Sequence, residues 1–383
     1  MIISRLVVRN WKNFVAIDLN LEERVFLVGP NASGKSNLLD IFHFMKDLVV
    51  SGGGLYQAVT RRGGINLIRS LAAPKNARIQ IELHFSSGPN GDALWRYALD
   101  LKPFPGKPAA PMVASERVWK GDRFILDRPD DADRRDKPRL RQTLLENVVT
   151  NGEFRPIADF FNSSAYFHLI PHQFRQEGDG GNELLSRGFS RRDFFRQVAA
   201  APPKTRTSRF RKIEAALKLS VPLLEHLRLD ESPEKEAHLE STFRNWRKGS
   251  PALHDTQLSD GLIRLVGILW SLMEKNSLLL LEEPELSLNT AVVRQLPGLI
   301  HRFRRSPSTQ VILSTHSPAL LSDPGIDGKE VVLLLPAEDR AIKVIRAAEL
   351  PDVSKLLEQG LSAGDVVLPR IQPARIEELG YFQ

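Results

Sequence analysis

The chain has 383 residues, of which 42% are hydrophobic and 26% are charged, and it carries a formal net charge of +7 with no cysteine. The absence of cysteine excludes disulfides and thiolate-bound metal, so the chain needs no oxidising compartment and we expect a cytoplasmic protein. The sequence has no apolar run that could span a membrane, and its first residues lack the basic, apolar and small-residue regions of a secretory signal.

The first half of the chain combines strand-like segments with one amphipathic helix. Alternating or continuous apolar patterns predict strands at residues 1–14, 25–28, 79–85, 95–101, 113–118 and 166–170. From Asn37 the apolar residues recur at helical spacing, which predicts a helix soon after the second strand. The three strands between residues 79 and 118 are bounded by glycine and proline and should form an antiparallel meander. The charge-dense segment 128–141 is predicted to be a surface loop.

The second half alternates helices with short, fully apolar strands. Residues 183–223 should be helical with an interruption at Ala201-Pro202-Pro203, and residues 227–229 and 238–246 should return to the core as strands. Apolar patterns further predict helices at 262–273, 292–303 and 353–359 and strands at 278–281, 311–314, 331–335 and 342–345. The expected fold is α/β, with parallel strands in its sheet, an antiparallel β lobe and a helical insertion.

A phosphate-binding loop follows the strand at 25–28. It matches the pattern G-x-x-x-x-G-K-[ST] in full, and its residues are Gly29, Pro30, Asn31, Ala32, Ser33, Gly34, Lys35 and Ser36, followed by Asn37. The glycines let successive backbone N–H groups turn inward as an anion-binding nest at a helix N-terminus. Lys35 would place its charge against the β- and γ-phosphates of ATP, and the Ser36 hydroxyl would be a ligand of Mg²⁺. The position between a buried strand and an amphipathic helix favours a nucleotide site over a structural glycine turn.

Two carboxylates far downstream supply a second half of such a site. Leu278–Leu281 form a fully apolar strand, and Glu282 and Glu283 follow it. This is the pattern of a Walker B strand, in which Glu282 would hold Mg²⁺ directly or through water and Glu283 would be the general base that activates the attacking water. The alternative is a strand that ends in two solvated glutamates, which the upstream phosphate loop disfavours.

Two further segments extend the pattern. Ser259 and Gly261 stand in an L-S-D-G turn before a long apolar helix, where the hydroxyl, the amide and the helix N-terminus would form a second anion site. Alone, this turn would be an ordinary helix N-cap, but it lies about 20 residues before the Walker B strand. His316 ends the strand at 311–314 and would hydrogen-bond the γ-phosphate. A single histidine would carry little weight, whereas the order of loop, signature turn, Walker B strand and histidine is that of an ATPase.

Four segments together resemble the ABC-type ATPase heads of the RecF, SMC and OLD-like families. They read SRLVVRNWKNF, LSDGLIRLVGILWSL, LLLLEEPELSL and ILSTHSP. The resemblance covers essentially the whole chain and is least constrained over residues 183–223. It implies a P-loop ATPase head built from residues 1–180 and 226–383, with a basic helical insertion at residues 181–225 between them.

The resemblance also assigns weaker motifs and exposes departures from the family pattern. The segment YFHLIPHQFRQ resembles a Q-loop, in which Gln173 would contact Mg²⁺ and Gln176 is the competing choice. Ser287-Leu288-Asn289 occupies the D-loop position, with asparagine where these families often carry aspartate or histidine. Glu282 replaces the more usual aspartate, so its contact with Mg²⁺ would more readily pass through water.

Two modules of related proteins are missing from this sequence. No coiled coil separates the two halves of the site, so the chain is no long-armed SMC protein. The roughly 65 residues after His316 are too few for a TOPRIM nuclease domain, so any nuclease action would come from a partner. The resemblance implies that ATP and Mg²⁺ are held in a head-to-tail homodimer, because in such heads the signature turn of one subunit closes over ATP on another.

The partner of such a dimer is left open by the sequence. The segment Arg187–Lys212 holds nine basic residues and one acid, with phenylalanines between them. It would suit the phosphate backbone of DNA, although it could equally be a solvated helical face with its phenylalanines in the core, or a docking surface for an acidic protein. Two classes of function follow: an ATPase that senses or maintains DNA, and the ATPase subunit of an antiphage or toxin-like system that controls a separately encoded effector.

Overall fold

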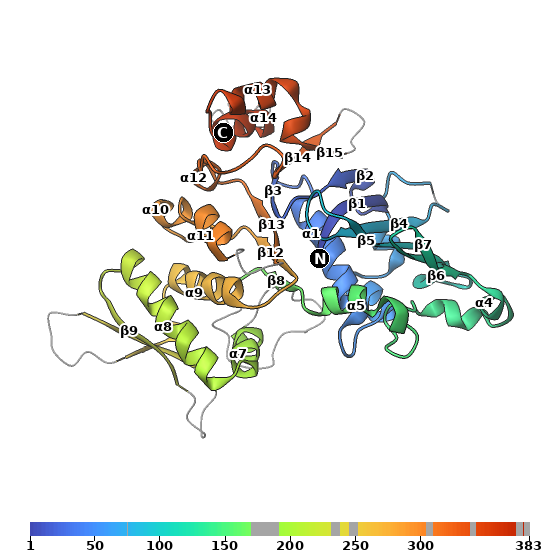
Figure 1. The fold of residues 1–383 in the computed structure, drawn as a ribbon, viewed down its shortest axis with the longest axis horizontal. Helices are drawn as coiled ribbons and strands as arrows, with labels where there is room; N and C mark the ends of the chain where they lie inside the picture. Colours follow the sequence, from blue (N-terminus) through green and yellow to red (C-terminus); the bar gives the residue numbers. More distant parts are fainter. Residues whose placement is uncertain are drawn as a thin grey trace.

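The computed structural model describes residues 1–74, 76–169, 191–230, 238–244, 252–303, 309–337, 342–372 and 378. Its helices and strands form two large sheets and a small third sheet, joined by helices that cover them (Figure 1). The helices are α1 (Lys35–Val49), α2 (Leu55–Thr60), α3 (Ile65–Ile68), α4 (Asp131–Arg135), α5 (Arg155–Asn162), α7 (Arg191–Ala200), α8 (Pro203–Ser220), α9 (Asp260–Met273), α10 (Thr290–Val293), α11 (Leu296–Phe303), α12 (Pro318–Leu321), α13 (Pro351–Glu358) and α14 (Ala363–Ile371).

The first sheet is antiparallel and has the order β2-β1-β4-β5-β6-β7. Its strands are β1 (Ile2–Trp11), β2 (Phe14–Asn20), β4 (Ile79–Ser86), β5 (Ala93–Phe104), β6 (Lys107–Lys120) and β7 (Arg123–Arg128). The predicted meander is confirmed in β4, β5 and β6. The strand expected over residues 1–14 is confirmed as β1, but it ends at Trp11, since the chain turns at Lys12 with a φ of 48° and returns as β2.

The second sheet is mixed and has the order β15-β14-β3-β13-β12-β8, in which every pair is parallel except β14 with β15. Its strands are β3 (Arg24–Val28), β8 (Ala165–Phe167), β12 (Leu278–Glu282), β13 (Gln310–Thr315), β14 (Val331–Pro336) and β15 (Ile342–Arg346). Strands from distant parts of the chain thus lie side by side within one sheet, with β3 between β14 and β13. Parallel strands end at the same edge, so the segments after β3, β12 and β13 meet there.

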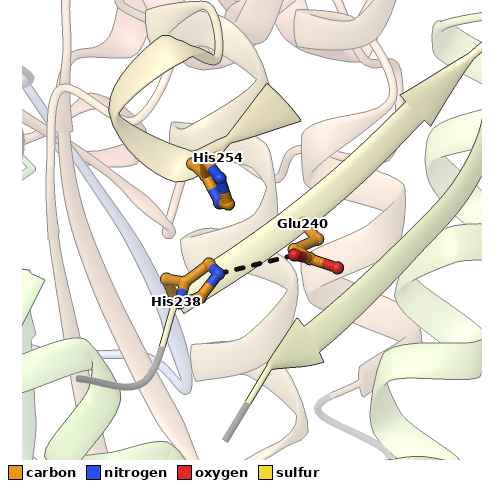
Figure 2. A group of neighbouring side chains, drawn as sticks. All are labelled: His238, Glu240 and His254. Atoms are coloured by element: carbon orange, nitrogen blue, oxygen red, sulfur yellow. Dashed lines mark ion pairs between the residues drawn. The ribbon is translucent and has the colours of Figure 1, made fainter. Parts of the chain in front are cut away.

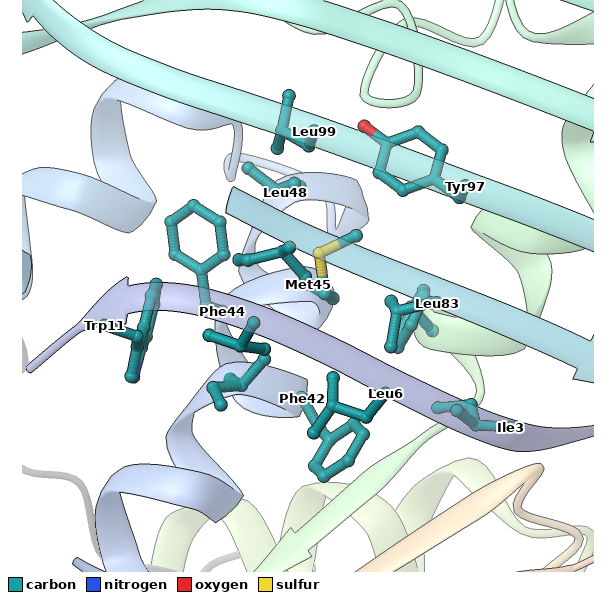
Figure 3. Packing of buried hydrophobic residues seen from close by; sticks show 14 of the residues in the cluster. Ile3, Leu6, Trp11, Phe42, Phe44, Met45, Leu48, Leu83, Tyr97 and Leu99 are labelled. Carbon is teal, nitrogen blue, oxygen red and sulfur yellow. The ribbon is translucent and has the colours of Figure 1, made fainter. Parts of the chain in front are cut away.

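The central strands β3, β12 and β13 are buried on both faces, which explains why their sequences are mostly apolar without alternation. Successive residues of β12 point into different cores: Leu278 and Leu280 face the antiparallel sheet, whereas Leu279 and Leu281 face the other side. Helix α1 belongs to the first of these cores, and Figure 3 shows its side chains packed against β1, β4 and β5. Helices α9 and α11 pack against the second core. Most of α1 is buried, including the charged side chains of Asp40 and Asp47.

A separate unit carries the helical insertion. Helices α7 and α8 are confirmed on either side of the proline interruption, as far as the structure describes this segment. Strands β9 (Leu224–Asp230) and β10 (His238–Phe243) confirm the prediction that strands return to the core here, since Leu224, Leu227 and Leu239 are buried in the second core. They pair with β11 (Leu253–His254) in a three-stranded sheet beside α8 (Figure 1). Helix α8 in turn packs against α9, so this sheet is joined to the second core.

Two other expectations are corrected by tertiary contacts. Segment 128–141 is no plain surface loop: it forms α4 and a 3₁₀ turn, and Arg128 and Asp133 are buried as an ion pair with a 2.8 Å contact. The helix predicted over 292–303 forms two helices, α10 and α11. Pro297 has no backbone N–H to donate within a continuous helix, so it lies in the first turn of α11. Among the described residues, no helix is long and apolar enough to cross a membrane.

Candidate nucleotide site

The phosphate loop connects β3 to α1 in a backbone conformation that depends on glycine. Gly34 has a φ of 97°, and a Cβ there would lie 2.2 Å from the amide nitrogen of Asn13. A Cβ at Gly29 would lie 2.6 Å from the Oγ of Ser33, which is buried without a hydrogen-bond partner among the described residues. The loop is thus closely packed from outside and keeps an unused polar atom within it.

Lys35 is buried at the first turn of α1, although it is a lysine. Its ammonium donates hydrogen bonds to the loop carbonyls of Gly29 at 2.8 Å and Pro30 at 3.1 Å. Burial lowers the pKa of Lys35, and the carboxylates of Glu282 and Glu283 act against this effect. A buried ammonium whose sequence neighbours offer it carbonyl oxygens would bind an anion strongly.

Ser36 and Glu282 come together from the two ends of the chain. The Ser36 hydroxyl donates to one carboxylate oxygen of Glu282, and the phenol of Tyr166 donates to the other. His168 lies next to this oxygen as well, with its Nδ1 at 3.6 Å. Tyr166 belongs to β8, which pairs with β12 in register at Leu280, so the sheet itself places the phenol beside Glu282.

Glu283 has different surroundings, although it is the next residue. Its φ of 42° is in the left-handed region, and its N–H donates to the backbone oxygen of Ser314 at 3.1 Å. The Nδ1 of His316 lies 3.2 Å from a carboxylate oxygen of Glu283. The two predicted residues therefore meet, and both side chains remain partly exposed where a ligand could reach them.

A third carboxylate behind this pair did not emerge from the motifs. Glu285 is buried and accepts hydrogen bonds from the Thr315 hydroxyl at 2.6 Å and from the His316 N–H at 3.3 Å. Burial raises its pKa above the usual glutamate range. Its contact with the backbone of His316 fixes the segment that carries the imidazole.

The signature turn lies at the N-terminus of α9 and against the D-loop of its own chain. Ser259 caps the helix by accepting from the Leu262 N–H at 3.4 Å. A Cβ on Gly261 would lie 2.5 Å from the carbonyl oxygen of Ser287. Arg264, one turn further on, is buried and donates to the carbonyl of Glu283 at 3.2 Å. Among the described residues, no hydrogen bond joins Ser259 or Gly261 to the phosphate loop.

Several residues of this site were missed or cannot be placed. Gln173 and Gln176, the Q-loop candidates, lie outside the described residues. Asn289 caps α10 by accepting from the Ala291 N–H. The sequence analysis assigned no role to Asn13, although its amide donates to the Ser33 carbonyl at 3.1 Å and its oxygen accepts from Asn37. Its place in the turn of the N-terminal hairpin gives no local signal, since the contact depends on how β1 packs.

The residues present fit a nucleotide and a divalent cation. The loop offers a buried ammonium and the unpartnered Ser33 hydroxyl inside a glycine-dependent turn, which suits phosphate oxygens. The hydroxyl of Ser36 and the carboxylate of Glu282 are hard oxygen ligands in contact, as a Mg²⁺ site requires. When bound, Mg²⁺ would neutralise phosphate charge at this position.

The fold is that of a P-loop ATPase head, with the phosphate loop and the two carboxylates at one edge of its mixed sheet. A family model described as "AAA domain, putative AbiEii toxin, Type IV TA system" matches residues 24–322, and the chain belongs to this family. A search of curated protein sequences finds no match.

Two solved structures show the same fold. An Smc head bound to the C-winged helix domain of ScpA is 16% identical, with a TM-score of 0.51 over 90% of this chain and 97% of that one. An Smc head with an extended coiled coil, bound to the C-terminal domain of ScpA from Pyrococcus furiosus, is 12% identical, with a TM-score of 0.51 over 94% and 99%. At such identities the likeness concerns the fold alone.

Proposed function

We propose that this ATPase head hydrolyses ATP and that ATP controls its association with a second copy of the chain. The observation that carries the proposal is the convergence of Lys35 and Ser36 with Glu282, Glu283 and His316 at one edge of the mixed sheet. One phosphate-binding segment and one acidic segment, more than 240 residues apart in sequence, thus face the same space.

Each of these residues has a role that follows from its surroundings. When ATP binds, the Lys35 ammonium would leave the two loop carbonyls and donate to phosphate oxygens. Their negative charge would then compensate for the burial of the ammonium. Ser36 and Glu282 would hold Mg²⁺, while Tyr166 orients the Glu282 carboxylate. Glu283 would accept a proton from the attacking water, and His316 would hold that carboxylate and contact the γ-phosphate.

The place of the signature turn supports the proposed dimer. Among the described residues, Ser259 and Gly261 make no hydrogen bond to the phosphate loop of their own chain, so the anion-binding end of α9 would act on a nucleotide held by a second chain. Two chains in head-to-tail order would enclose two nucleotides. Hydrolysis would then release the dimer, and the output would be a change of population between separate and joined heads.

A Glu283→Gln variant tests both halves of this proposal. Loss of the general base should lower ATP turnover by about 10²–10⁴-fold while leaving nucleotide binding in place. The variant should therefore accumulate as an ATP-dependent dimer in size-exclusion chromatography with ATP and Mg²⁺. The matched control is Lys35→Ala, which should bind ATP weakly and stay monomeric. Wild-type turnover in Glu283→Gln would refute the assignment of the base.

DNA is the partner that the charge distribution favours. In the described part of the basic segment, Lys204, Arg211 and Lys212 are exposed on α8, where they could contact a phosphate backbone. The phenylalanines there are core residues: Phe194, Phe195 and Phe210 are buried. They are therefore unavailable for stacking on bases. Stimulation of ATP turnover by DNA, with a steep dependence on salt, would support this partner.

An effector protein is the second candidate, and the family description favours it. That description names a putative toxin of a type IV toxin–antitoxin system, and a toxin–antitoxin system has a second component. Copurification of a small protein encoded beside this chain, together with ATP turnover that does not respond to DNA, would support the effector over DNA.

A further inference from the structure

The three-stranded sheet of the insertion brings two histidines and a glutamate together, away from the nucleotide site. Figure 2 shows His238 and Glu240 on β10 and His254 at the end of β11, with their side chains directed toward one another. One donor atom from each residue lies within 4.8 Å of the other two. His238 is buried, Glu240 is partly buried and His254 is exposed, so the group is open to solvent on one side.

The register of the strands produces this cluster. Residues two apart on a strand share a face, which puts His238 and Glu240 on the same side of β10. Glu240 pairs with His254 across β10 and β11, and His238 pairs with Asp230 across β10 and β9. The opposite side of the sheet carries Leu227 and Leu239, both buried against the helices. The polar face therefore holds these side chains on a backbone fixed by its own hydrophobic side.

We propose that His238, Glu240 and His254 bind a divalent transition-metal ion, with Zn²⁺ as the best match. Two imidazoles and one carboxylate are the donor set that Zn²⁺ takes in proteins, whereas Mg²⁺ and Ca²⁺ prefer oxygen alone. Tetrahedral Zn²⁺ with ligands at about 2.0–2.1 Å needs donor atoms about 3.3 Å apart. The Nε2 of His238 and the Oε1 of Glu240 are already 3.6 Å apart. The donor atom of His254 lies within 4.8 Å of these two, so it would have to move closer to complete the site.

The neighbouring charges set the conditions for binding. Asp230 adds a second carboxylate, with its Oδ2 at 3.5 Å from the Nε2 of His238, as a further ligand or as compensation for the metal charge. Arg228 lies opposite Glu240 on β9 and is exposed, so it can turn away into solvent. The carboxylates therefore attract a cation to the two imidazoles.

His254 stands at the start of the 3₁₀ turn Asp255–Gln257, and its backbone N–H donates to the side-chain oxygen of Gln257 at 3.0 Å. A metal ion held by the His254 ring would therefore act on a turn that leads into Ser259.

Zinc titration of the whole chain tests this site, without nucleotide or Mg²⁺. Zn²⁺ binding is measured by equilibrium dialysis and metal analysis for wild type, His254→Ala, Glu240→Gln and His226→Ala. His226 is the matched control, because it is an exposed histidine on β9 of the same sheet. Wild type and His226→Ala should bind the same number of ions. The two cluster variants should lose one equivalent of Zn²⁺ or bind it at least about 10-fold more weakly. Even the loss of an outer-shell partner costs about 10-fold or more in metal affinity, so the loss of a direct ligand should cost at least as much.

A second measurement uses the wild-type chain alone, so its result does not depend on whether the variants fold. Co²⁺ added in place of Zn²⁺ should give the intense visible absorption of a tetrahedral site with nitrogen ligands, and one equivalent of Zn²⁺ should abolish it. Equal Zn²⁺ binding in wild type and both cluster variants would overturn the proposal. So would an equal loss in His226→Ala, or Co²⁺ spectra that are no different from those of the free ion.

Discussion

At the scale of single residues, the adjacent carboxylates of Glu282 and Glu283 are held by different partners. Glu282 is buried and receives the hydroxyls of Ser36 and Tyr166. Glu283 is partly exposed and lies beside His316. The backbone of Glu283 adopts the left-handed conformation, which separates its side chain from that of Glu282. This difference suits one carboxylate to a cation and the other to a water molecule.

Tyr166 should position the cation ligand. We predict that Tyr166→Phe raises the Mg²⁺ concentration needed for half-maximal ATP turnover by about 10-fold, because loss of such an outer-shell partner costs about 10–100-fold in metal affinity. The measurement is a Mg²⁺ titration of turnover at fixed ATP. Tyr56→Phe is the control, since Tyr56 is exposed on α2 and should leave the titration unchanged. An unchanged Mg²⁺ dependence in Tyr166→Phe would contradict this role.

Arg128 shows how a charged residue can be part of the core. It is buried between Glu116, at 2.9 Å, and Asp133, at 2.8 Å. We predict that Arg128→Met lowers the free energy of unfolding by about 3–5 kcal/mol, because it leaves two buried carboxylates without their cation. Arg134→Met is the control in the same segment: its pair with Asp131 is exposed and should contribute less than about 1 kcal/mol. Urea unfolding measures both, and equal effects would contradict the prediction.

The same cluster predicts how stability depends on pH. The hydrogen bonds from Arg128 and Arg139 hold the pKa of Asp133 well below its usual value of 3.8. The folded state thus keeps this carboxylate ionised under conditions that protonate it in the unfolded chain, so its stabilising effect is complete above pH 3.8 and is lost as the pH falls further. The free energy of unfolding is measured with urea at decreasing pH for wild type and Asp133→Asn. The variant should be less stable than wild type at neutral pH, and its free energy of unfolding should fall less in acid. Parallel losses in both proteins would exclude Asp133 as a source.

At the scale of elements, α9 joins the signature turn to the Walker B strand. Its first turn lies against Ser287, and Arg264 donates to the carbonyl of Glu283. A shift of this helix would therefore move the backbone of the proposed general base. The contact depends on a glycine at position 261, because any side chain there would meet backbone.

Gly261→Ala should disturb this junction. The new Cβ would lie 2.5 Å from the Ser287 carbonyl, and overpacking of this kind costs about 1–3 kcal/mol. We predict reduced stability in thermal unfolding and reduced ATP turnover. Gly298→Ala is the control: it lies in α11 with nothing within 4 Å of its Cβ, so it should be neutral or stabilising by up to about 1 kcal/mol. A fully active, stable Gly261→Ala would contradict the importance of this contact.

At the scale of the whole molecule, the insertion adds a sheet of its own to the two large sheets (Figure 1). Helix α8 carries exposed cations, among them Lys204, Arg211 and Lys212. A unit of this kind can contact DNA or a protein without changing the nucleotide site directly, and α9 packs against α8 in the same core. Contact with a partner could therefore reach the signature helix through packed side chains.

Exposed cations on α8 should set the salt dependence of DNA binding. We predict that Arg211→Ala combined with Lys212→Ala weakens DNA binding and reduces the slope of log K against log salt by roughly 1.8, or about 0.9 for each lost phosphate contact. Fluorescence polarisation with duplex DNA over a range of salt measures this. The control is Arg134→Ala with Arg135→Ala, two exposed cations on α4. Equal slopes in both double variants would exclude α8 as the contact.

The sequence by itself determined the class of fold and the order of the proposed site motifs. The loop Gly29–Ser36 and the pair Glu282 and Glu283 are readable because phosphate and metal binding demand particular residues at short spacing, next to strands that must be apolar to be buried on both faces. Only the tertiary structure decided which side chains meet across long separations. Tyr166 reaches Glu282 because β8 pairs with β12, and the histidines meet because β10 pairs with β11. Arg128 is buried because it pairs with Glu116 of β6 and Asp133 of α4. Such contacts depend on strand pairing and register, which leave no local pattern in the chain.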